Sequence, residues 1–207
     1  MRFSDSDKAM IMQAVIAAEK QTSGEIVPVI AHQSGDYAEV FRKISAIGIG
    51  LAAVIAICVH ARYPFFDVRY LILFPILGHS LGYVLMPFGA LTRWVVGGTE
   101  LAENVHNGAL AAFSRHGLHH TKGETGVLIY ISLLEHRVEI LADRGIHSKV
   151  GEGYWREEVA KIVAGIKEKR AASALAEVIQ EIGAKLAQHF PAAPGDKNEL
   201  PDDLRSR

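Results

Sequence analysis

The feature that most constrains the fold is an apolar run in the first third of the chain. Ile44–Ala61, ISAIGIGLAAVIAICVHA, has eighteen residues and no Asp, Glu, Lys or Arg. As an α-helix it would be about 27 Å long, close to the hydrocarbon thickness of a bilayer. We therefore predict a transmembrane helix here. The alternative is a buried helix in a soluble domain, because length alone does not separate the two.

A second apolar run, Tyr70–Thr92, has twenty-three residues without a formal charge, enough to cross a bilayer with some tilt. The connection RYPFFDVR, Arg62–Arg69, places aromatic side chains between two arginines, as is typical of a headgroup interface. Two such runs are hard to bury in a chain of 207 residues. We predict a transmembrane hairpin over residues 42–94.

Small residues in the two runs favour close packing of helices in a membrane. Gly78 and Gly82 are four residues apart, the spacing of a helix-association motif. Self-association through this pair, giving a homo-oligomer, is therefore one hypothesis.

The totals exclude two classes of protein. The formal charge is −1 and the basic residues are scattered, so we expect no nucleic-acid partner. Cys58 is the single cysteine, which excludes an intramolecular disulfide.

The charges near the chain start and the apolar runs predict a location. Asp5, Asp7 and Lys8 interrupt the N-terminal segment, which therefore does not resemble a signal peptide. Two crossings return the chain to one side of the membrane. The basic residues outside the hairpin loop slightly outnumber those within it, so we expect both soluble segments in the cytoplasm and an integral plasma (inner) membrane protein.

The segment before the hairpin predicts a helix and a strand. Ser4 and Asp7 have the spacing of a capping box, and the following apolar stripe has a helical period. Gly24 is the predicted C-cap of that helix. Glu25–Ala31 reads as a strand, and Pro28 favours a position at the edge of a sheet.

The segment after the hairpin predicts further helices around two strands. Thr99 is the predicted cap of a helix that ends at Gly117. Gly126–Leu133 and Arg137–Ala142 read as a β-hairpin. Two amphipathic helices follow, with apolar stripes over 155–166 and 175–186. The tail, 191–207, is too rich in proline and charge to add to a core.

Several of these stretches resemble the TPM domain family. They are AEKQTSGEI at Ala18–Ile26, TGVLIYISLLEHRVEILADRGI at Thr125–Ile146, Trp155, HFP at His189–Pro191 and NELPD at Asn198–Asp202. The chain is most similar to a bacterial membrane-anchored branch in which a transmembrane hairpin is inserted in the domain.

The resemblance implies an α/β fold, a small mixed β-sheet sandwiched by helices and interrupted by a two-helix transmembrane hairpin. Residues 1–41 and 95–190 would form the TPM-like domain, 42–94 the hairpin and 191–207 a polar tail. Relatives include lumenal proteins credited with weak acid phosphatase activity and calcium binding. The resemblance transfers no catalytic residue to this chain.

Glu25, Asp143 and Arg144 form the candidate polar or metal site. Glu25 opens the first strand and Asp143 closes the third, so antiparallel strands would bring both carboxylates to one edge of the sheet. Two acids there could hold calcium or another divalent cation, or act as acid and base. The alternative is structural: Asp143 caps backbone amides or pairs with Arg144. No cofactor is firmly implied, and the identity of any metal is unknown.

A second group consists of His106, His116, His119 and His120. His116 and His120 would share a helix face only if the helix continued past Gly117, and no cysteine lies nearby. We favour a partly solvated surface over a zinc site.

The leading functional prediction is an interaction, assembly or quality-control module at the cytoplasmic face of the bacterial plasma membrane. Its partners would be the lipid bilayer and a membrane protein, and no catalysis is assigned. The alternative is a weak metal-dependent, acid-phosphatase-like hydrolase of phosphomonoesters that uses Glu25 and Asp143.

Overall fold

The computed structural model describes residues 3–63, 72–85, 89–121, 123–192 and 205–206. The chain divides into two compact units: Met1–Ser34 with Ala102–Arg207, and Gly35–Leu101. The first unit is therefore built from both ends of the chain, and the second is the segment between them.

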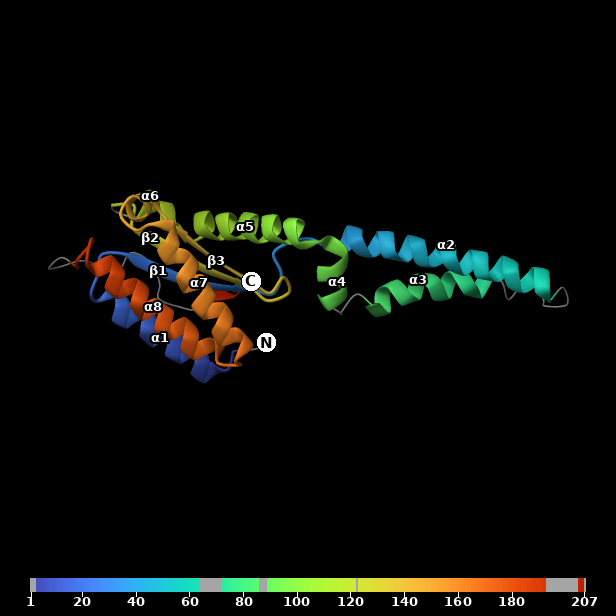
Figure 1. Ribbon diagram of the computed structural model, residues 1–207, viewed down its shortest axis with the longest axis horizontal. Helices are drawn as coiled ribbons and strands as arrows, with labels where there is room; N and C mark the ends of the chain where they lie inside the picture. Colours follow the sequence, from blue (N-terminus) through green and yellow to red (C-terminus); the bar gives the residue numbers. More distant parts are fainter. Residues whose placement is uncertain (1–2, 64–71, 86–88, 122, 193–204, 207) are drawn as a thin grey trace. The chain divides into compact units, whose positions relative to one another are not determined.

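A mixed sheet lies at the centre of the first unit (Figure 1). Its strands are β1 (Glu25–Ala31), β2 (Gly126–Ser132), β3 (Arg137–Ala142) and the two-residue β4 (Arg205–Ser206), in the order β3-β2-β1-β4. β1 runs parallel to β2 and to β4, whereas β3 is antiparallel to β2. The mixed sheet predicted from the sequence is confirmed.

β1 and β2 are buried along their whole length, because helices cover both faces of this sheet. Alternate residues such as Ile26 and Ile129 pack against α1 (Asp5–Glu19), α7 (Glu152–Lys167) and α8 (Ala171–Ala187). Residues of the opposite parity, such as Val27 and Tyr130, pack against the part of α5 (Gly98–Arg115) that belongs to this unit. The predicted sandwich of helices and sheet is therefore confirmed.

Local signals at the helix ends give a mixed result. The capping box holds: the Asp7 amide donates to Ser4 Oγ, and the Ser4 amide donates to the Asp7 carboxylate. Gly117 follows α5 with φ 72°, as a helix-ending glycine should. The prediction for Gly24 is wrong, because α1 ends at Glu19 and Lys20 is its C-cap. Thr99 is also not a cap, since α5 begins at Gly98.

The chain between α1 and β1 is held by the residues that follow α8 instead of by a glycine cap. Thr22 Oγ1 donates to the Phe190 carbonyl over 2.6 Å, and Thr22 forms an isolated bridge with Pro191. β4, from the predicted polar tail, pairs with Val29 and Ile30. The edge position predicted from Pro28 is wrong, because β1 lies between β2 and β4 in the sheet.

The second unit contains α2 (Ala38–Arg62), α3 (Leu73–Leu85) and α4 (Gly89–Val96). Among the described residues, α2 is the one helix long and apolar enough to cross a membrane, with a mean hydropathy of 2.3 in its most apolar window. The predicted span Ile44–Ala61 lies within it.

Over the described residues, the second predicted span contains two helices, and its crossing of a membrane stays a prediction. Tyr70–Thr92 is represented by α3 and the start of α4, and residues 70–71 and 86–88 lie outside the described part, as does most of the predicted loop. Pro75 occupies the first turn of α3, where its missing N–H costs no helical bond. α3 alone would be about 20 Å long, shorter than the hydrocarbon layer.

α2 and α3 lie side by side and run in opposite directions (Figure 1). A Cβ on Gly48 would come within 2.7 Å of the Gly78 carbonyl oxygen, and one on Gly78 within 2.5 Å of the Gly48 oxygen. The two backbones are therefore in direct contact. Gly78 thus packs against Gly48 of its own chain. The formation of a homo-oligomer through Gly78 and Gly82 stays a prediction.

Candidate functional site

The predicted carboxylates lie at the same end of the sheet. Glu25 is in register with Gly126 of β2, and the Asp143 amide donates to the Gly126 carbonyl over 2.9 Å. β1 and β3 flank β2 and run in opposite directions, so Glu25 and Asp143 are separated by two strand spacings, about 10 Å. This is the strand arrangement that the candidate site requires.

Asp143 uses one of its two carboxylate oxygens to cap a helix. Oδ1 accepts a hydrogen bond of 2.8 Å from the Arg144 amide at the start of the short helix α6 (Arg144–His147). Oδ2 is buried and accepts no hydrogen bond from the residues that the structure describes. The Arg144 side chain is exposed. The capping role is thus present, and it leaves the second carboxylate oxygen buried without a hydrogen bond from the described residues.

Glu19, which the sequence reasoning missed, brings a third carboxylate to this end of the sheet. Its Oε1 accepts a hydrogen bond of 2.8 Å from the Ile26 amide, next to Glu25, which is itself buried. The only sequence signal was its place inside the stretch AEKQTSGEI. Within the described residues, no three His, Cys, Asp or Glu side chains lie close enough together to hold a metal ion.

A buried polar network lies at the opposite end of the sheet and was also missed. The Ser34 amide donates to Glu135 Oε1 over 2.8 Å, and the Ser34 hydroxyl donates to Ser132 Oγ over 2.8 Å. Ser132 donates in turn to Glu135 Oε2, and the Tyr130 hydroxyl lies 3.1 Å from that of Ser34. Ser132, Tyr130 and Glu135 are almost fully buried, so their hydroxyls and carboxylate are closed to a substrate. The network instead fixes the chain that follows β1.

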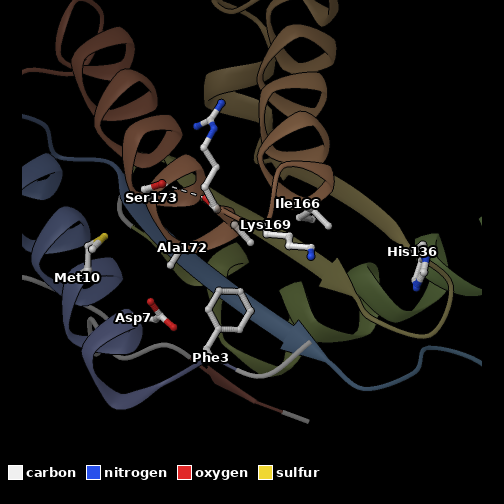
Figure 2. Close-up of a pocket in the computed structure, with 10 residues that line it drawn as sticks. Phe3, Asp7, Met10, His136, Ile166, Lys169, Ala172 and Ser173 are labelled. Atoms are coloured by element: carbon white, nitrogen blue, oxygen red, sulfur yellow. Dashed lines mark hydrogen bonds between the residues drawn. The ribbon is translucent and has the colours of Figure 1, made fainter.

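A cavity of about 640 Å³ opens between the start of the chain, the β2–β3 turn and the α7–α8 turn (Figure 2). Figure 2 shows the Phe3 ring within the lining, with Met10 and His136 on opposite sides of it. His136 and Lys169 both have left-handed backbones, with φ 55° and 62°. Such strained conformations occur often at functional sites.

Two polar groups of this cavity, those of Asp7 and Ser173, have structural roles. Hydrogen bonds from the Ser4 backbone and side chain lower the pKa of Asp7, which belongs to the capping box of α1. The Ser173 hydroxyl donates to the Arg170 carbonyl over 3.0 Å. The lining therefore offers a hollow that could bind a ligand, but the described residues place no nucleophile beside a base there.

The comparison with known families identifies this architecture. Residues 95–185 of the chain match a TPM domain.

The TPM domain of this chain also resembles a solved structure. The NMR structure of the BA42 protein from the psychrophilic bacterium Bizionia argentinensis superposes with a TM-score of 0.62 at 19% identity, over 100% of this chain and 97% of that one. This likeness shows the fold alone. A comparison with curated proteins finds no sequence match.

The matched part of the TPM domain includes β2, β3, Asp143 and Arg144, while Glu25 lies before it on β1. The two candidate carboxylates therefore come from segments on opposite sides of the α2–α4 insertion. They share a sheet because β1 pairs with β2.

The histidines in the TPM domain do not form one group. His106 Nδ1 lies 2.5 Å from Glu139 Oε1, whereas the rings of His119 and His120 contact each other with centroids 3.8 Å apart. α5 ends at Arg115, so His116 and His120 do not share a face of that helix. The condition for a zinc site on one helix face is therefore not met.

Proposed function

We propose that this is an integral membrane protein whose TPM domain binds a membrane-protein partner at the cytoplasmic face of the plasma membrane, in assembly or quality control. The observation that carries the proposal is the exposed apolar surface of α2. Only Ser45 and Ala56 of its described residues are buried. Ile47, Leu51 and Ile57 are 63%, 61% and 67% exposed.

This exposure favours lipid over the core of a soluble protein. The core helix of a soluble protein buries its large apolar side chains, and an apolar face of this extent exposed to water promotes aggregation. α3 adds Ile76 and Leu77, which are also more than half exposed. A bilayer is the surrounding that suits both helices.

The sheet of the TPM domain supports a hairpin over a single crossing. β1 belongs to Met1–Ser34, and β2 and β3 belong to Ala102–Arg207, yet they form one sheet. If α2 crosses the bilayer, the chain must return before Ala102 for these strands to pair. The segment containing α3 and α4 is the return path.

The two connections to the membrane favour a binding role. A domain attached at two points reorients less than a domain on one flexible linker, so partners in the same membrane meet it at a high effective concentration. An interaction module benefits from both effects.

Cys58 provides the first test, because it is the single cysteine and lies exposed on α2. In sealed native membranes it should resist a membrane-impermeant maleimide and react after detergent is added. The protein should also stay in the membrane pellet after alkaline carbonate extraction. Rapid labelling of Cys58 in intact membranes would overturn the membrane part of the proposal.

The binding role has its own test. Crosslinking in native membranes, followed by affinity capture of the tagged full chain, should enrich the same membrane proteins in repeated preparations. A tagged unrelated hairpin protein serves as the control. Identical captured sets from the two proteins would contradict the binding role while leaving the anchor intact.

A weak metal-dependent phosphomonoesterase is the second candidate, favoured by the buried Asp143 Oδ2 at the Glu25 end of the sheet. The purified full chain would then release phosphate from p-nitrophenyl phosphate only with a divalent cation. Asp143→Asn and Glu25→Gln would abolish this turnover, while the exposed control Glu152→Gln would keep it. Turnover that survives Asp143→Asn would reject this candidate.

A further inference from the structure

The side chain of Trp94 on α4 is not covered by the described residues. It is 82% exposed, the highest value among the described large apolar side chains, and its neighbour Val95 is 41% exposed. Thr92 on the same helix is only 1% exposed. α4 therefore has one packed side and one side that presents a tryptophan outward.

The contact between Gly48 and Gly78 shows which residues of α2 and α3 lie at the same level, and hence at which end of the hairpin α4 begins. α2 and α3 are antiparallel, so residues equally far from this contact lie at the same level. Val84 comes six residues after Gly78 and is level with Arg42, six residues before Gly48. α4 begins shortly after α3 ends, and it contacts α2. It therefore lies at the end of the hairpin where α2 begins.

This end carries charges that mark the headgroup level. Arg42 and Lys43 are exposed and directly precede the apolar run Ile44–Ala61. Lys43 Nζ lies 3.1 Å from Glu39 Oε1. Basic residues at the end of an apolar helix sit among lipid headgroups. Trp94, next to Arg93 on α4, is thus placed at the depth where tryptophan is enriched in membrane proteins.

The orientation of α4 also fits a position at the membrane surface. Figure 1 shows α4 running across the axis of α2 instead of continuing along it. A helix that lies in the plane of the membrane surface places its apolar side chains at the boundary of headgroups and acyl chains. Its orientation, its exposed Trp94 and its contact with the lipid-facing α2 all point to one occupant of this face, the bilayer surface.

We infer that α4 is an interfacial helix whose Trp94 and Val95 insert at the boundary of headgroups and acyl chains. This inference rests on the proposed membrane anchor and extends it, because α4 then fixes how deeply the α2–α3 hairpin sits. Trp94 is the main contact, and Arg93 borders the headgroups.

Fluorescence tests the inference, because the chain has two tryptophans and Trp155 is only 8% exposed, in the core of the TPM domain. Full-length Trp155→Phe, which retains Trp94 alone, is reconstituted in vesicles of equal amounts of phosphatidylcholine and phosphatidylglycerol. If Trp155→Phe fails to fold, the Trp94 signal is obtained by subtracting the emission of Trp94→Phe from the emission of the wild type.

Lipids brominated near the headgroup should quench Trp94 several-fold more than lipids brominated near the chain end, and aqueous acrylamide should quench it weakly. Strong quenching by acrylamide with none by brominated lipid would overturn the inference, as would strongest quenching from the chain end. Labelling of Cys58 in the same vesicles distinguishes failure of the interfacial-helix inference from failure of the proposed membrane anchor. A protected Cys58 with a water-accessible Trp94 rejects only the interfacial helix, whereas a reactive Cys58 rejects the anchor itself.

Discussion

At the scale of single residues, the network around Glu135 ties the end of β1 to the β2–β3 turn. Its carboxylate accepts hydrogen bonds from the Ser34 amide and from the Ser132 hydroxyl inside the protein. Removing a buried acceptor leaves such donors unsatisfied, which costs more than the bond itself contributes.

We expect Glu135→Ala to lower the free energy of unfolding by about 1–3 kcal/mol. Glu135→Gln, which keeps one carbonyl oxygen for the Ser34 amide, should cost less. Thermal or urea unfolding of the detergent-solubilised chain measures both. Equal stability of Glu135→Ala and wild type would show that the network does not hold this segment.

Glu158 on α7 makes stability depend on pH. Its side chain is 1% exposed, and burial raises its pKa above 4.5, although the hydrogen bond from Lys161 opposes the rise. The folded state therefore binds this proton more tightly than the unfolded state. The resulting stability is fully present below pH 4.5 and is lost as pH rises through the raised pKa.

Glu158→Gln should remove this loss, because glutamine stays neutral at every pH. The fall in the unfolding midpoint as pH rises above 4.5 should become smaller in the variant. Exposed Glu157→Gln is the matched control and should leave the profile as in wild type. Parallel profiles for Glu158→Gln and wild type would contradict this assignment.

At the scale of secondary-structure elements, glycines set how closely helices approach. A Cβ on Gly183 of α8 would lie 2.5 Å from the Ala18 Cβ of α1, whereas one on Gly153 of α7 meets nothing within 4 Å. We expect Gly183→Ala to destabilise the TPM domain by about 1–3 kcal/mol through overpacking. Gly153→Ala should be neutral or stabilise it by up to about 1 kcal/mol. Unfolding of both variants in one detergent tests the difference.

The hairpin offers a second matched pair. Gly78→Leu would force α3 away from Gly48, while Gly50→Leu adds a side chain where nothing lies within 4 Å. The first variant should lower the thermal stability and the yield of folded protein in detergent, and the second should not. Equal loss in both would mean that the contact between Gly48 and Gly78 is not important.

The elements that sequence reasoning predicted well are those with strong local signals. β2 and β3 are apolar runs joined by a turn, which the sequence shows directly. Gly117 ends a helix through its own backbone conformation, a positive φ, so no distant residue has to be known to predict it. Gly24 failed because the chain there is held by Thr22 and Phe190, which are far apart in sequence. Glu19 and the Ser132–Glu135 network were missed for the same reason, since their partners are set by tertiary packing.

At the scale of the whole molecule, the TPM domain requires both of its segments on one side of a membrane. In a Cys58→Ser background, exposed Lys20→Cys and Lys149→Cys report on the segments before and after the insertion. Both should react with an impermeant maleimide in inside-out vesicles and stay unreacted in intact cells. Labelling of the two positions from opposite sides would contradict the common sheet as well as the proposed topology.

The pairing of β1 with β2 also governs the order of events during biosynthesis. β1 leaves the ribosome well before β2, and the whole of the second unit is translated between them. Its main neighbour in the sheet does not yet exist, so β1 must wait unpaired until the intervening segment has been delivered to its final environment. A ribosome stalled shortly after Leu101 would thus carry a nascent chain with an unfinished domain, open to chaperones and proteases.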